Sequence, residues 1–148
     1  MYQLLLFLHV VGVVGFAAGH GVSAIVMIRL PREHGEARLQ ALLDLSRSTL
    51  LLSNLSLLLV LASGVGLWLR FDYDPQGWLW ASLGVLALLA AGGVGLASPL
   101  FRRIRAALAT GDGKELEALL ASRAPWTVLA LETSGTIVIL WLMVLKPF

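Results

Sequence analysis

Four long apolar runs, separated by shorter polar or mixed segments, dominate the pattern of hydrophobic and polar positions along the chain. They cover about residues 2–28, 49–69, 78–97 and 126–145, and Glu132 is the only Asp, Glu, Lys or Arg within them. A helix needs about 20 apolar residues to cross a hydrocarbon core of about 30 Å. The alternation typical of barrel strands is absent, and lipid-exposed backbone must satisfy its hydrogen bonds within the segment. We therefore predict an all-α protein, a four-helix transmembrane bundle, as a single transmembrane domain over residues 1–148.

The two longer connections, residues 29–48 and 98–125, have amphipathic patterns. The first begins with a turn at Pro31 and Gly35 and continues as a helical pattern, which either lies along the membrane surface or extends the second span. The second contains two helical pieces that break at the Gly-Asp-Gly of residues 111–113. The connection between the second and third spans is a tight polar turn with Tyr73, Pro75 and Gly77, where Pro75 and Gly77 stop helix growth.

Basic residues are concentrated in residues 29–48 and 98–125, which predicts how the bundle is oriented. Nine of the eleven Lys and Arg residues lie in these two segments, whereas the other two, Arg70 and Lys146, lie near the opposite end of the spans. The positive-inside rule places both segments in the cytoplasm and both termini outside (N-out/C-out). An aromatic belt agrees with this orientation. Trp126 marks the inner side, and the outer aromatic residues are Trp68, Tyr73, Trp78, Trp80 and Trp141.

Composition supports the membrane class and removes several kinds of chemistry. Hydrophobic residues make up 58% of the chain and charged residues 14%, with a mean hydropathy of +0.85, whereas soluble domains have about a quarter charged residues. The basic isoelectric point reflects arginines beside apolar runs, so we expect contact with anionic lipid headgroups and not with nucleic acid. The absence of cysteine excludes disulfides, thiolate metal sites, c-type haem attachment and cysteine nucleophiles. The first apolar run is too long for a cleavable signal peptide, so we expect it to be retained.

Ionisable and polar residues inside the spans are the candidates for function, because such groups are costly in lipid. His9 and His20 are separated by eleven residues, about three helical turns or about 16 Å, and therefore share one face of the first span. The orientation places His20, Asn54 and Glu132 at one depth on three different helices. It also places His9 near the depth of Met143.

Each of these residues has a structural and a functional interpretation. His9 is either an interfacial histidine or an axial ligand of haem iron. His20 either forms a hydrogen bond with Glu132 or Asn54, or provides a second ligand site or a proton-handling pair with Glu132. Glu132 itself can be a protonated carboxyl bonded to a neighbouring helix. His34 is expected to be solvated in its charged segment, and Met27 and Met143 are more often packing residues than ligands.

Glycines lie close to the histidine face of the first span. Gly12, Gly15 and Gly19 indicate either close helix packing or room for a flat macrocycle beside His9. The other spans contain no histidine, so two histidines of one chain cannot hold haem between two helices. The second axial position would be Met143, a lysine, water, nothing, or a histidine from a second copy in a symmetric dimer.

The sequences LHVVGVVGFAAGHG in the first span and WLMVLKPF at the C-terminus carry a family resemblance. The chain resembles small four-span bacterial membrane proteins of unknown function, in the wider group of HemJ-type protoporphyrinogen oxidases and copper-resistance D domains. The resemblance implies the bacterial inner (cytoplasmic) membrane and haem b ligated by His9. In the copper-type relatives, His9, Met143 and Met1 would be metal contacts. The third span lacks the lysine of HemJ-type proteins, a departure that weakens the case for oxidase activity and leaves haem binding open.

Together these features favour a b-haem-binding integral membrane protein that acts in electron transfer or porphyrin handling. Whether it is an enzyme stays open, with a haem-dependent oxidoreductase as the candidate activity. Two alternatives belong to other classes: a non-catalytic accessory subunit of a larger membrane complex, and a metal or proton transporter that uses His20 and Glu132. We expect a homo-oligomer or a larger membrane complex as the working assembly.

Overall fold

The computed structural model describes residues 1–70 and 77–147, and within these residues the chain is helical with no strand. A 3₁₀ turn, Leu30–Arg32, follows the first helix, and a π-helical turn, Gly93–Ala97, joins the third and fourth helices. The expected positions of Tyr73 and Pro75 in a tight turn lie outside the described residues. The helices are α1 (Tyr2–Arg29), α2 (Glu36–Arg70), α3 (Gly77–Gly92), α4 (Ser98–Thr110), α5 (Gly113–Ala121) and α6 (Ala124–Leu145).

Four helical stretches are long and apolar enough to cross a membrane, which confirms the four-helix prediction. They are Tyr2–Arg32, Glu36–Arg70, Gly77–Thr110 and Ala124–Leu145. The second and third contain 35 and 34 residues, so each is about 50 Å long at 1.5 Å per residue. A bilayer core of about 30 Å cannot cover that length. The helical pattern of residues 36–48 therefore extends the second span, and α4 continues α3 beyond the apolar run.

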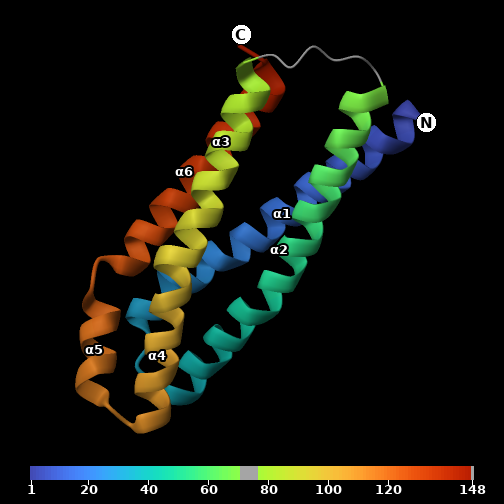
Figure 1. Cartoon of the computed structure of the whole chain (residues 1–148). Coiled ribbons are helices and arrows are strands. Elements are labelled where there is room, and N and C mark those ends of the chain that lie inside the picture. Colours follow the sequence, from blue (N-terminus) through green and yellow to red (C-terminus); the bar gives the residue numbers. More distant parts are fainter. Residues whose placement is uncertain (71–76, 148) are drawn as a thin grey trace.

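The helices form two antiparallel pairs, α1 with α2 and α3 with α6 (Figure 1). The pairs meet in the lower half of the view, near α4 and α5, and diverge toward the upper end, where both termini lie. α1 contacts α6 as well as α2, so α1 links the two pairs. The end that we expect to face the cytoplasm is thus the more closely packed end of the bundle.

Small residues bring α1 and α2 into close contact. A methyl group added to Gly12 would lie 2.8 Å from Val60 Cγ2 and 3.0 Å from the Val60 nitrogen, too close for ordinary packing. Close approach of helix backbones at small residues is the usual way that helices associate in lipid, where the hydrophobic effect gives no drive. Down the seam, Gly12 faces Val60 and Ser56, Gly15 faces Ser56, and Gly19 faces Ser53.

A reciprocal fit joins α3 and α6. Leu131 of α6 occupies the space over Gly92, and Leu89 of α3 occupies the space over Gly135, where an added methyl group would lie 2.5 Å from Leu89 Cδ2. Each helix therefore gives a leucine to the glycine of the other. This pairing fixes the vertical register of α3 against α6.

The largest buried core lies at the lower end, where α1, α2, α4, α5 and α6 converge. Arg105 of α4 donates a 2.7 Å hydrogen bond to the Leu43 carbonyl of α2 and ties these two helices together. α4 ends at Gly111, which has a positive φ of 69°, and Asp112 caps α5 by accepting a hydrogen bond from the Glu115 nitrogen at 3.0 Å. The expected break at Gly-Asp-Gly is thus confirmed. The core residues are Val26, Met27, Leu30, Leu39, Leu43, Ala97, Leu100, Ile104, Ala107, Leu119 and Val128.

Candidate functional site

His9 lies on the upper half of α1 with its imidazole turned toward α2. Its Nδ1 is 3.0 Å from the Val60 carbonyl oxygen and 3.2 Å from Ser63 Oγ. A methyl group on Gly64 would lie 3.3 Å from His9 Cε1, so the missing side chain at Gly64 makes the notch that receives the ring. The ring is half-buried and is held by contacts from a single neighbouring helix.

These two contacts determine which ring nitrogen carries the proton. A carbonyl oxygen can only accept, so Nδ1 must be the donor to Val60. Ser63 donates its own hydroxyl to the Leu59 carbonyl at 2.5 Å, which leaves its oxygen lone pairs free to accept from Nδ1. In the neutral imidazole, Nε2 therefore bears the lone pair. Metal-ligating histidines are oriented in this way, with the far nitrogen bonded to a backbone carbonyl.

The partners of His9 on α2 were not among the candidates from sequence. Ser63 is buried and lies next to Gly64, so this pair supplies both an acceptor and a space. The signal was present: Ser63 lies seven residues before the end of α2 at Arg70, and His9 lies seven residues after the start of α1 at Tyr2. The equal depths of these residues in the α1–α2 hairpin predict the contact.

His20 lies on the same side of α1 as His9 but has a different environment. Its Nδ1 is 3.2 Å from the Phe16 carbonyl oxygen one turn earlier, and its ring centroid is 4.1 Å from that of Phe16. The same reasoning assigns the proton to Nδ1 and the lone pair to Nε2. His20 is thus held by its own helix, and neither Asn54 nor Glu132 is its hydrogen-bond partner in the described part of the chain.

Glu132 and Asn54 have separate surroundings. Glu132 Oε2 accepts a 3.1 Å hydrogen bond from Ser23 Oγ, which connects α6 to α1 where the two pairs cross. Asn54 lies on the exposed side of α2, whereas its neighbours Ser53 and Ser56 face α1. The three residues predicted at one depth therefore do not form one cluster. Ser23, and not His20, is the hydrogen-bond partner of Glu132.

The methionines and His34 also have defined positions. Met143 is half-buried near the upper end of α6. The two helix pairs diverge at this end, so it is separated from the N-terminal half of α1 (Figure 1). The structure does not bring Met143 to His9. Met27 is fully buried in the lower core, and Met1 Sδ accepts from Arg70 Nη1 at 3.3 Å. His34 is exposed, with Nδ1 3.0 Å from the Arg32 carbonyl oxygen.

No group of three or more His, Cys, Asp or Glu side chains that could hold a metal ion is present in residues 1–70 and 77–147. Axial ligation of haem iron makes no demand for such a group, because the porphyrin supplies the other nitrogen ligands and one imidazole is sufficient. His9, His20 and His34 all have Nδ1 next to a backbone carbonyl oxygen, and His9 differs from the other two in that its carbonyl partner lies on a neighbouring helix.

Residues 3–147 match the family described as Predicted integral membrane protein (DUF2269). The chain belongs to this family. Membership in DUF2269 agrees with the four spans found in the structure and supports an integral membrane protein in a lipid environment. No curated protein and no solved structure matches the chain. The DUF2269 description gives a location without an activity, and the relation to HemJ-type oxidases and copper-resistance D domains stays a prediction.

Proposed function

We propose that this DUF2269 protein binds haem b through His9 Nε2 in the bacterial cytoplasmic membrane and acts in electron transfer or porphyrin handling. The observation that carries the proposal is the hydrogen bond from His9 Nδ1 to the Val60 carbonyl, with Ser63 as second acceptor. This contact holds the imidazole in the tautomer that a haem ligand needs. His20 offers the same tautomer and is the candidate for a second site.

The α1 residues around His9 are apolar, but Gly12 and Leu5 already pack against Val60 and Gly66 of α2, so a flat group at Nε2 would lie outside this seam. The residues one turn away on the same face of α1 are Leu5, Gly12 and Val13, which are aliphatic or lack a side chain. Hydrocarbon and helix surfaces around the ring exclude water, and exclusion of water is one of the factors that set a haem's potential. The donor, the orientation of the donor and the apolar surface are therefore all supplied by α1 and α2.

Haem, when bound, supplies one-electron chemistry, and the residues of this chain have positioning roles toward it. His9 would hold the haem iron through Nε2. The Val60 carbonyl and Ser63 Oγ keep the proton on His9 Nδ1 and fix the ring plane. Gly64 lets the ring lie close to α2 because it has no side chain that would occupy the same space.

A histidine of a second copy of the chain would be the other protein ligand of the haem iron. The spans hold no further histidine beyond α1, and Met143 lies away from His9. Asn54 adds an independent reason for association, since its amide is on the exposed face of a span and has no hydrogen-bond partner among the described residues. An amide in hydrocarbon gains about 1–2 kcal/mol or less by bonding across helices, which favours a homo-oligomer through α2.

We expect Asn54→Leu to shift the purified protein toward the monomer, because it removes the amide while keeping an apolar surface. Mass photometry in detergent measures the distribution. Ser134→Leu is the matched control, because Ser134 is also exposed in a span but already donates its hydroxyl to the Leu131 carbonyl at 3.3 Å. An unchanged distribution in Asn54→Leu would contradict the role of Asn54.

Titration of the purified protein with haemin tests the proposed cofactor. We expect the Soret absorbance to rise and to saturate at one haem per two chains if His9 of a second copy completes the coordination, or at one haem per chain if each His9 holds its own haem; binding at His20 would add further haem. A His34→Ala variant is the control and is expected to give the same curve, because His34 is exposed outside the spans. Absorbance that rises without saturation, as haemin partitions into detergent, would count against the site.

A further inference from the structure

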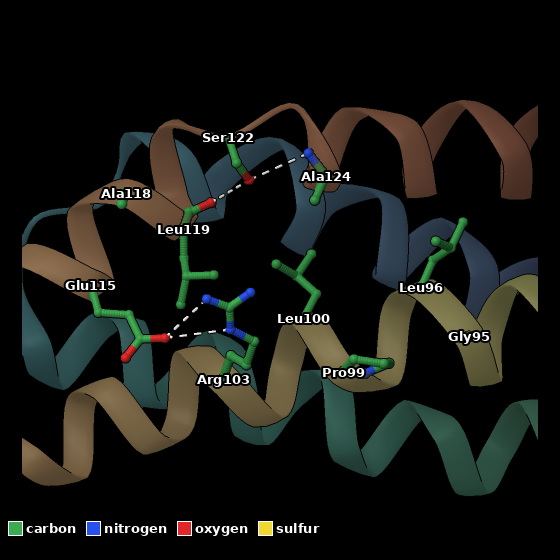
Figure 2. Close-up of a pocket in the computed structure, with 10 residues that line it drawn as sticks. All are labelled: Gly95, Leu96, Pro99, Leu100, Arg103, Glu115, Ala118, Leu119, Ser122 and Ala124. Carbon is green, nitrogen blue, oxygen red and sulfur yellow. Dashed lines mark hydrogen bonds and ion pairs between the residues drawn. The ribbon is translucent and has the colours of Figure 1, made fainter.

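A half-open cavity of about 400 Å³ lies on the surface between α4, α5 and the start of α6 (Figure 2). This volume is within the range of about 300–1,000 Å³ that is typical of small-molecule sites. Leu100 of α4 and Leu119 of α5 point into it, and Arg103 reaches from α4 toward Glu115 on α5. The full lining is Gly95, Leu96, Pro99, Leu100, Arg103, Glu115, Ala118, Leu119, Ser122 and Ala124.

The upper wall of the cavity belongs to the π-helical turn Gly93–Ala97. In this turn the Ser98 nitrogen bonds to the Gly93 carbonyl, and Ser98 Oγ donates to the same carbonyl at 3.0 Å. π-helical turns inside helices occur frequently at functional sites. A methyl group added to Gly95 would meet nothing within 4 Å, so the backbone here lines open space.

The cavity lies across the expected boundary between hydrocarbon and water. Gly95 and Leu96 belong to the end of the third apolar run, and Leu96 is 48% exposed. Arg103 is seven residues further along a continuous helical path, about 10 Å at 1.5 Å per residue. One end of the cavity is therefore apolar and at membrane level, and the other end carries a cation at the level of headgroups.

The lining contains one cation and one anion, Arg103 and Glu115, within a segment that has an excess of basic residues. Residues 98–125 contain five basic and three acidic residues, and basic pockets between helices on the cytoplasmic side recognise anionic headgroups. Arg103 Nη2 is 3.1 Å from Glu115 Oε1, with the two side chains 64% and 42% exposed. Such an exposed pair contributes little, so a phosphate can replace the carboxylate. Arg103 then forms a bidentate contact that suits its planar guanidinium.

We propose that this cavity binds an anionic phospholipid of the adjacent leaflet, with the phosphate on Arg103 and an acyl chain against Gly95 and Leu96. The two ends of the cavity select the two parts of the molecule. A zwitterionic lipid brings a cation as well as a phosphate to Arg103, and a free phosphate leaves the apolar end unfilled. The site is independent of His9, which lies on the upper half of α1.

Binding of phosphatidylglycerol to the full chain in detergent, measured by native mass spectrometry, tests this proposal. We expect phosphatidylglycerol to bind with at least about tenfold higher affinity than phosphatidylcholine, as the net gain from one charge-assisted contact predicts. Arg103→Gln is expected to remove this preference. Glu115→Gln is expected to increase phosphatidylglycerol affinity, because it removes the carboxylate that competes for Arg103.

Two matched controls separate the cavity from general charge and from helix propensity. Arg102→Gln removes the same charge from an exposed position outside the lining and is expected to keep the preference. Gly95→Leu fills the cavity and is expected to lower lipid affinity, whereas Gly84→Leu, also in open space on α3, is expected to leave it unchanged. Equal loss in Arg102→Gln and Arg103→Gln, equal binding of both lipids, or full competition by inorganic phosphate would each overturn the proposal.

Discussion

Replacing His9 with alanine is expected to remove haem from the His9 site completely while the bundle stays folded. The variant loses the only imidazole on the upper half of α1. It leaves no orphaned polar group on α2, because Ser63 Oγ still bonds to the Leu59 carbonyl. The lost contact is a single hydrogen bond to a neutral ring, so the free energy of unfolding should fall by about 0.5–1.5 kcal/mol. Haem per chain and thermal unfolding measure the two effects separately.

His20→Ala is the matched comparison, because it removes the same side chain from the same face of α1. A protein with one haem at His9 keeps its full haem content in this variant, and a protein with two haems keeps half. His9→Ala with undiminished haem content and an unchanged spectrum would show that His9 is not a ligand. Loss of helical circular dichroism in His9→Ala would instead assign the residue a structural role.

Replacing Gly12 with leucine is expected to separate α1 from α2 and to produce the largest loss of stability of any substitution discussed for the spans. The first added atom already meets the Val60 side chain and backbone and lies 3.1 Å from the Ser56 carbonyl oxygen. A backbone cannot rotate away as a side chain does, so the helices must move apart. Overpacking of this kind costs about 1–3 kcal/mol, and occasionally more. Equilibrium unfolding in mixed micelles measures the change.

Gly21→Leu is the control for this substitution. Gly21 lies on the same helix with nothing within 4 Å of an added methyl group. Both substitutions therefore gain the same helix propensity, but only Gly12→Leu produces a clash with α2. His9 is less than one turn above Gly12. Gly12→Leu is therefore also expected to lower haem affinity, because it moves the His9 imidazole away from the Val60 carbonyl oxygen. Equal stability of the two variants would contradict close packing at Gly12.

The length and number of the spans could be predicted from the sequence because hydrocarbon thickness sets a strict requirement on apolar runs. Rotation of each helix about its axis could not, and the predicted cluster of His20, Asn54 and Glu132 shows why. Depth along a span fixes height only, whereas contact also needs the side chains to face one another. Small residues at Ser53 and Ser56 turn that face of α2 toward α1, and Asn54 is thereby directed outward.

The sequence could not predict that α2 begins well before its apolar run or that α4 continues the path of α3 beyond its own. Both features depend on tertiary contacts, which a local pattern does not contain. Leu39 and Leu43 are predicted by the pattern to be on an apolar face, but a membrane surface and a protein core satisfy that face equally well. The structure favours the core because Ile104 and Leu119 arrive there from α4 and α5. The cavity above this core depends on the π-helical turn, for which the glycines at 92, 93 and 95 were the visible sign.

The most direct test of the proposed function is the absorbance spectrum of the protein purified from membranes of cells with ample haem supply, first air-oxidised and then reduced with dithionite. Haem ligated by His9 predicts a Soret band that shifts on reduction, with α and β bands that sharpen if a second copy completes the coordination. A colourless protein with an intact helical spectrum would contradict haem binding and would favour an accessory or transport role.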